Sequence, residues 1–169
     1  MNNKMTFGKY EGKNFEWIFF KDAGYVEWIL EHGIDRQDHF GEEQSDYFEE
    51  LYQRATHLSG TCRRCKERPI TRMGLTTSFK NHELLAVGFY CDECEYRGGA
   101  ATGYYPPAFF VEAYTLEPGE QKMVINEVRR HYIGTDGNLT QKKMEMFFHN
   151  DENFSDCTAG FFNRLEVVA

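Results

Sequence analysis

Four cysteines in two couples constrain the fold of this chain more than any other feature. Cys62 and Cys65 flank two residues in Cys-Arg-Arg-Cys, and Cys91 and Cys94 do the same in Cys-Asp-Glu-Cys, twenty-five residues further on. Each couple can form a tight turn that directs both sulfurs to one ion, at about 2.3 Å for zinc, and two turns complete a tetrahedron. Because protein ligands then fill every position, the sequence predicts one structural Zn²⁺ and no catalytic metal.

Disulfides or a redox couple are the alternative explanation of these cysteines, and they fit less well. A thioredoxin-like couple needs no matching second couple. Cys157 stands apart from both couples, and a free cysteine is usually a small buried apolar residue in a reducing compartment. We therefore expect a cytoplasmic protein. The sequence has no apolar stretch of signal-peptide or bilayer length, so no membrane association is expected.

The predicted fold class is α+β, with three segments along the chain. Residues 1–60 form a small α/β module that ends in an acidic helix. Residues 61–105 resemble a four-cysteine zinc ribbon, in which β-hairpins carry the two cysteine turns. Residues 106–169 form a mainly helical region, because apolar side chains recur there at helical spacing.

Turn and cap residues locate the elements of the first segment. Residues 6–10 alternate enough to predict a strand. Asn14 and Asp22 can each cap a short helix, and Gly33 can end the second of these. A third helix starts at Gly41, with aromatic and aliphatic residues on one face and glutamates on the other.

Strands are predicted in the second segment and helices in the third. Residues 69–79 and 83–90 are rich in residues that favour strands, with a reversal between them. Pro118 is suited to the first turn of a helix, and further helices are predicted at 140–148 and 155–165.

The amino-terminal residues resemble a known module. Phe-Gly-Lys-Tyr-Glu-Gly-Lys at 7–13, followed by Asp-Ala-Gly-Tyr-Val-Glu-Trp-Ile-Leu at 22–30, is similar to the small unit at the carboxy-terminal end of exodeoxyribonuclease X-like proteins. The resemblance covers the first thirty-five to sixty residues and does not include the nuclease domain of that family. It implies an accessory unit associated with nucleic acid, in which Lys9, Tyr10 and Lys13 are the matching positions available for contact.

Basic residues gather around the first cysteine couple, although the net charge of the chain is −8. Residues 61–100 carry seven bases and five acids, a balance of +2. Such a patch favours phosphate contact. Zinc with four thiolates has a charge of about −2, so these bases could instead neutralise the metal site. The clustered bases are Arg63, Arg64, Lys66, Arg68 and Arg72.

Two functions from different classes follow. No nucleophile elbow, phosphate-binding Walker loop or His-Glu-x-x-His helix occurs in the sequence, which predicts a protein that is not an enzyme. The first interpretation is a zinc-stabilised accessory subunit that binds DNA or RNA, in partnership with a nuclease, a helicase or a ribonucleoprotein. The second is a protein–protein interaction subunit or inhibitor, in a bacterial or phage conflict system, that binds such a partner directly.

Overall fold

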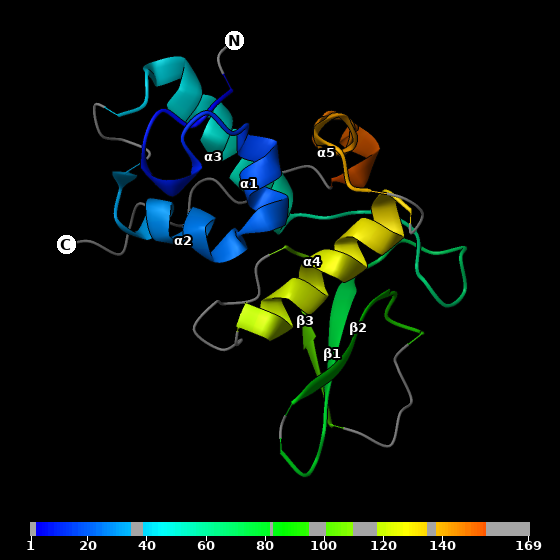
Figure 1. Ribbon diagram of the computed structural model, residues 1–169. Helices are drawn as coiled ribbons and strands as arrows, with labels where there is room; N and C mark the ends of the chain where they lie inside the picture. The colour runs from blue at the N-terminus through cyan, green and yellow to red at the C-terminus, as the bar shows by residue number, and fades with distance from the viewer. Residues whose placement is uncertain are drawn as a thin grey trace, which may run out of the picture.

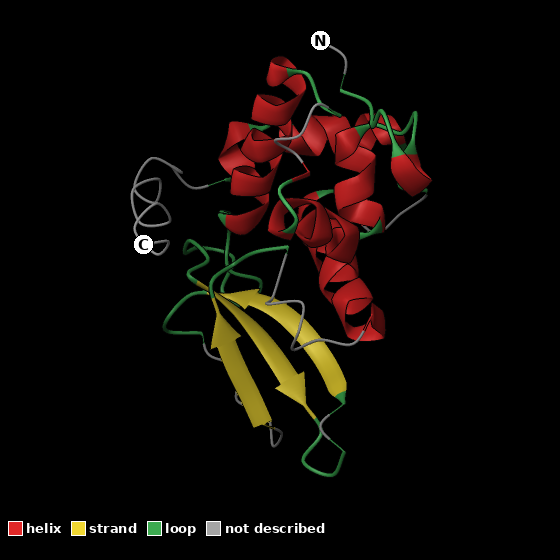
Figure 2. Ribbon diagram, turned by 90° about the vertical axis from the view of Figure 1, so that its left-hand side faces the viewer, coloured by secondary structure: helices red, strands yellow, loops and turns green. Residues whose placement is uncertain are grey.

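The computed structural model combines a group of helices with a small antiparallel sheet. Its helices gather at one end of the molecule and the sheet lies at the other, with α4 along the boundary between them (Figures 1 and 2). The predicted α+β class is confirmed. The structure describes residues 3–34, 39–81, 83–94, 101–109, 118–134 and 138–154.

Three helices precede the sheet in the chain. They are α1 (Phe15–Lys21), α2 (Ala23–Glu31) and α3 (Glu42–Thr56). The first two begin directly after the predicted cap positions Asn14 and Asp22, although the side chain of Asn14 makes no capping hydrogen bond, and α3 begins one residue after its predicted start. Asp22 lies between α1 and α2, where its side chain accepts a hydrogen bond from the backbone N–H of Tyr25 at 3.1 Å. This bond satisfies one of the free N–H groups in the first turn of α2.

The prediction of a strand at residues 6–10 is wrong. This segment contains a 3₁₀ turn, η1 (Gly8–Tyr10), in place of an extended strand. Gly8 and Gly12 have φ angles of +70° and +78°, which turn the chain away from the strand direction and which glycine adopts without strain. The Gly12 N–H then donates to the carbonyl of Met5 at 2.8 Å and closes the loop.

The sheet has three antiparallel strands in the order β2-β1-β3. These are β1 (Arg72–Thr77), β2 (Leu84–Tyr90) and β3 (Ala101–Tyr105). The two predicted strands are thus present in shorter form, whereas β3 was not predicted. β1 is the central strand, because it pairs with β2 on one side and with β3 on the other.

One face of the sheet packs against α4 (Pro118–Tyr132). Met73 pairs with Phe89 across the two strands, and both side chains are buried. The ring of Phe89 lies 5.2 Å from that of His131 and 5.8 Å from that of Tyr132, both on α4. Apolar burial between this helix and the sheet therefore joins the two ends of the molecule.

The helix that starts at Pro118 and the helix predicted at 140–148 are both present. The second is α5 (Gln141–Phe148), and a short 3₁₀ turn, η4 (Asp151–Asn153), follows it. Thr140 precedes α5, and its hydroxyl accepts a hydrogen bond from the N–H of Lys143 at 3.4 Å. The helix predicted at 155–165 and Cys157 lie outside the described residues.

The core is one continuous cluster of buried apolar side chains that includes residues from all three predicted segments. Aromatic rings fill much of it, mostly in edge-to-face contact, as between Phe20 and Phe109 at 4.9 Å. The backbone also connects the segments, because the N–H of Phe109 donates to the carbonyl of Ala55 in α3 at 2.7 Å. The largest buried rings are Phe15, Phe19, Phe48, Phe89, Phe109 and Phe148.

Candidate metal centre

The β1–β2 hairpin brings the two cysteine couples to the same end of the sheet. β1 begins at Arg72, a few residues after the first couple, and β2 ends at Tyr90, directly before Cys91. Arg72 and Tyr90 are paired across the two strands. Because β1 and β2 are antiparallel, the start of β1 lies beside the end of β2. The cysteine couples, which adjoin these two strand ends, therefore lie close together.

The four sulfurs form a compact cluster that can hold one metal ion. The Sγ atoms of Cys62, Cys65, Cys91 and Cys94 all lie within 4.8 Å of one another, and Cys65 and Cys91 are 3.9 Å apart. For a tetrahedral ion with sulfur ligands at about 2.3 Å, the expected S···S separation is roughly 3.8 Å. These separations are too long for a disulfide, whose sulfurs are about 2.05 Å apart, and all four cysteines are free thiols.

Each couple forms a tight turn, here called a knuckle. In the first knuckle the N–H of Lys66 donates to the carbonyl of Cys62 at 2.9 Å, and Lys66 has a φ of +59°. In the second, the N–H of Cys94 donates to the carbonyl of Cys91 at 3.1 Å. Each knuckle therefore fixes its own two cysteines through a local backbone hydrogen bond, and the hairpin brings the two knuckles together.

The ionisation of the four thiols is uneven. Burial opposes ionisation of Cys62, but hydrogen bonds from the backbone of Cys65, Cys91 and Arg64 outweigh it and lower the pKa of Cys62 to about 6. Burial, followed by hydrogen bonds with the other three sulfurs, raises the pKa of Cys94 to about 12. Four thiolates at this spacing repel one another, so a divalent cation is the group that this cluster is suited to hold.

Acidic residues of the second knuckle neutralise two of the predicted phosphate-binding arginines. Arg68 forms an ion pair with Glu93. The Nε of Arg72 donates to Asp92 Oδ1 at 2.9 Å. The sequence contains the signal for this pairing, because Cys-Asp-Glu-Cys is acidic where Cys-Arg-Arg-Cys is basic.

A third arginine connects the first knuckle to α4. Nη1 of Arg63 donates to Oε1 of Glu127 at 2.8 Å, and Arg130 forms an ion pair with the same carboxylate. Glu127 is only 5% exposed. Burial raises its pKa, against the opposing effect of the two arginines. Sequence reasoning missed Glu127 because it is far from Arg63 in the chain. Only the fold brings these two side chains together.

The other two bases of the predicted cluster, Arg64 and Lys66, are exposed on the first knuckle. Three arginines of the cluster thus pair with acids, and the side chains of Arg64 and Lys66 are exposed beside the cysteines. These three ion pairs account for the charge of the arginines through carboxylates, and they test neither phosphate contact nor neutralisation of the metal site. The exposed bases remain the candidates for phosphate contact.

The predicted contact residues of the amino-terminal turn bond within the protein. Nζ of Lys9 lies 2.7 Å from Asp22 Oδ2, and the hydroxyl of Tyr10 donates to the same oxygen at 2.8 Å. Nζ of Lys13 lies 5.5 Å from the ring centre of Trp17. Figure 1 shows this turn (dark blue) beside α2, away from the green loop after α3 that carries the first knuckle. The structure therefore does not bring the two predicted contact regions together.

Replacing Asp22 with alanine is expected to lower the free energy of unfolding by about 1–2 kcal/mol, because the variant loses the cap of α2. It also loses the contacts with Lys9 and Tyr10. Burial opposes ionisation of Asp22, but these contacts and the N–H of Tyr25 lower its pKa below 3.8. The stabilisation should therefore be present above pH 3.8 and be lost as the pH falls through the folded-state pKa.

Urea unfolding of the wild type and Asp22→Ala between neutral and acidic pH measures this difference. Asp46→Ala, at an exposed position on α3, is the control and should change stability by less than about 0.5 kcal/mol. An Asp22→Ala effect that stayed constant down to the lowest pH would contradict the assignment.

Comparison of the chain with protein-family models, curated proteins and solved structures finds no match. The resemblance of residues 1–60 to the exodeoxyribonuclease X-like module thus stays a prediction. Within the described ranges, no helix has both the length and the apolar character needed to cross a bilayer. The feature with the most definite chemistry is the cluster of four thiols, which is a candidate site for one metal ion.

Proposed function

We propose that this protein is a non-enzymatic accessory protein that binds DNA or RNA, stabilised by one structural zinc ion. Four thiolates in a tetrahedron are a donor set that zinc prefers. With all four ligands from protein, the ion has no open position for water or substrate. We also propose a cytoplasmic location, where a reducing environment keeps thiol ligands available.

The outer face of the sheet supports nucleic-acid binding. Tyr90 and Tyr104 are half-buried there, with their rings against two glycines. A Cβ added to Gly88 would lie 2.6 Å from Cζ of Tyr90, and one added to Gly74 would lie 3.6 Å from Cε1 of Tyr104. Because neither glycine has a side chain, both rings lie close to the strand backbone. We call Tyr90, Tyr104 and the adjacent Arg72 the tyrosine face.

The tyrosine face has the chemistry of a surface for unpaired bases. Aromatic rings on a sheet provide stacking surfaces that accept any base, and nearby cations contact the phosphates. The guanidinium of Arg72 lies 5.8 Å from the ring centre of Tyr104 and is paired with Asp92, so contact with phosphates is assigned to the exposed knuckle bases Arg64 and Lys66. Tyr90 directly precedes Cys91, so the face begins at the metal end of the sheet, near the bases of the knuckles. This proximity is the observation that carries the proposal.

Binding of a labelled single-stranded oligonucleotide, measured by fluorescence anisotropy at several salt concentrations, tests it. We expect affinity to fall steeply with salt, and Arg64→Glu and Lys66→Glu each to reduce the slope of log K against log salt by about 0.7. Tyr104→Leu should weaken binding by about 1–3 kcal/mol, because one base loses its stacking partner. Arg63 is unsuitable for this test, since its replacement would also disturb Glu127.

Lys142→Glu provides the charge-matched control, because Lys142 is exposed on α5. It should leave the salt slope unchanged. Two outcomes would contradict the proposal: no binding at low salt, or equal loss of affinity in Lys142→Glu and Arg64→Glu.

The second candidate function is binding of a protein partner, and the β1–β2 hairpin favours it. Phe79 is 68% exposed and Leu85 is 55% exposed. Large apolar side chains with this exposure are typical of interaction surfaces when they lie close together. If no oligonucleotide binds at low salt, this surface becomes the better candidate, with an enzyme or a ribonucleoprotein as the partner.

A further inference from the structure

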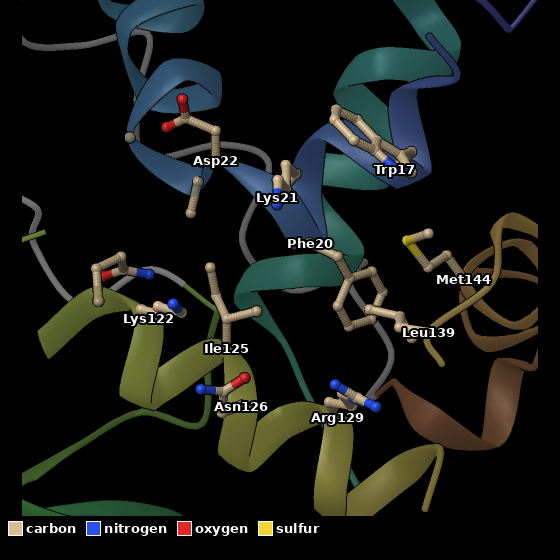
Figure 3. Close-up of a pocket in the computed structure, with 13 residues that line it drawn as sticks. Trp17, Phe20, Lys21, Asp22, Lys122, Ile125, Asn126, Arg129, Leu139 and Met144 are labelled. Atoms are coloured by element: carbon tan, nitrogen blue, oxygen red, sulfur yellow. The ribbon is translucent and has the colours of Figure 1, made fainter. Parts of the chain in front are cut away.

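A cavity of about 670 Å³ lies between the helices, away from the sulfur cluster. Its walls come from the end of α1, the start of α2, one side of α4 and residues near the start of α5 (Figure 3). Sites for small organic ligands are usually cavities of about 300–1,000 Å³. The volume is thus sufficient for a ligand of the size of a nucleotide.

Cations face this cavity from two sides. Lys21 extends from α1, and Lys122 and Arg129 extend from α4 (Figure 3). Across the described residues, neither lysine forms an ion pair or a hydrogen bond with a carboxylate. Asp22 also lines the cavity, but its carboxylate points away from α4 (Figure 3) and bonds Lys9, Tyr10 and the N–H of Tyr25. The cavity therefore concentrates positive charge in a chain of net charge −8.

Apolar side chains form the rest of the wall. Phe20, Ile125 and Met144 are buried, and Trp17 and Leu139 lie beside them at the cavity. Trp17 provides an aromatic surface, and the other four provide aliphatic or aromatic contact area. A purely ionic ligand such as inorganic phosphate would leave this wall uncovered. The cavity fits an anion that also has a flat apolar part.

One polar atom in the wall lacks a partner within the described chain. Nε2 of Gln121 donates to the carbonyl of Phe109 at 2.6 Å, which fixes the orientation of the side-chain amide. Its Oε1 is buried and accepts no hydrogen bond from the described residues. A buried acceptor without a donor is costly. The atom has almost no surface open to the cavity, so this cost belongs to the packing of α4 and is not evidence for a ligand.

We propose that this cavity binds a nucleotide, with the phosphate between Lys21 of α1 and Lys122 of α4. The base would cover the apolar wall. A nucleoside 5′-monophosphate combines the two properties that the wall requires, an anionic end and a flat ring. The same chemistry is present in a free nucleotide and at the 5′-phosphorylated end of a strand. The proposal does not depend on nucleic-acid binding at the tyrosine face.

Isothermal titration of the zinc-loaded full chain with deoxyadenosine monophosphate, and separately with deoxyadenosine, tests the anion site. We expect the monophosphate to bind at least about tenfold more tightly, since charged hydrogen bonds contribute about 1.5–3 kcal/mol each. Equal affinity for the two compounds would overturn the proposal. So would the absence of saturable binding at millimolar monophosphate.

Lysine variants test whether the monophosphate binds in the cavity. Lys21→Gln and Lys122→Gln should each raise the Kd for the monophosphate about tenfold. Lys142→Gln, a matched change of one exposed lysine outside the cavity, should leave the Kd unchanged. Because all three lysines are exposed, the variants should fold like the wild type, which near-ultraviolet circular dichroism checks. If all three variants bind as the wild type does, the cavity is not the site.

Competition separates the two sources of the ligand. A short strand with a 5′-phosphate and the same strand with a 5′-hydroxyl are each titrated against bound monophosphate. Displacement by the phosphorylated strand alone would support the cavity and assign it to strand ends. Displacement by neither would support it as a site for free nucleotide. Equal displacement by both strands would overturn the requirement for a terminal phosphate, because the strand with a 5′-hydroxyl carries only internal phosphodiesters.

Discussion

Replacing Cys91 with serine is expected to abolish metal binding and to unfold the sheet end of the molecule. A structural zinc ion contributes about 10–16 kcal/mol of apparent free energy to folding. A typical domain is stable by only about 5–15 kcal/mol in total. Cys91 is buried and directly follows β2, so the strand ends lose their connection when this ligand is lost. Elemental analysis should find less than one zinc per chain, and near-ultraviolet circular dichroism should lose the part of the aromatic signal that comes from the sheet end, where Phe89, Tyr90 and Tyr104 lie.

Cys157→Ser is the control for this experiment. Cys157 belongs to neither knuckle, so the variant should keep one zinc per chain and the wild-type spectrum. Removing the metal from the wild type with a strong chelator should reproduce the spectrum of Cys91→Ser, and added zinc should reverse the change only in the wild type. One zinc per chain in Cys91→Ser, with an unchanged spectrum, would show that the four sulfurs are not the ligands.

The second large effect is expected at Phe148, on α5. Phe148→Ala should lower the free energy of unfolding by about 3–5 kcal/mol, because truncating a buried phenylalanine removes apolar contact and leaves a cavity. Phe148 is 0% exposed. Its ring lies 5.4 Å from that of Phe19 and 5.8 Å from that of Phe109, so one truncation affects contacts with two other parts of the chain. Urea unfolding of metal-loaded protein measures the difference.

Met146→Ala is a matched control on the same helix. Met146 is 62% exposed, so its truncation should cost less than about 0.5 kcal/mol. If the two variants lost equal stability, the aromatic cluster around Phe148 would not be a major part of the core.

Local signals in the sequence predicted the helices well. The first turn of a helix needs a partner for its N–H groups, and Asp22 and Thr140 supply one through their own side chains. The cysteine couples were equally informative, because each knuckle closes over a few residues. In both cases the residues that determine the structure are neighbours in the chain.

Features that depend on distant residues were not predictable in the same way. β3 pairs with β1, and although Thr102, Tyr104 and Tyr105 favour strands, Ala101 and Gly103 interrupt the pattern within a segment of only five residues. Glu127 meets Arg63 only after α4 packs on the sheet. Likewise, Lys21 and Lys122 come from separate helices, and only the fold brings them to one cavity. The prediction of a strand at residues 6–10 was wrong for a different reason. It used the alternation of apolar and polar residues, which does not reveal the positive φ of Gly8.

The helix α4 contributes residues both to the surroundings of the metal centre and to the cavity. Glu127 on this helix bonds Arg63 beside the first knuckle, while Lys122 and Arg129 on the same helix line the cavity. A shift of α4 would therefore change the contacts at the first knuckle and in the cavity at the same time. Thermodynamic linkage then imposes a reciprocal relation: any factor by which bound metal changes the affinity of the cavity for an occupant is also the factor by which that occupant changes the affinity for metal. Measuring either coupling would determine the other.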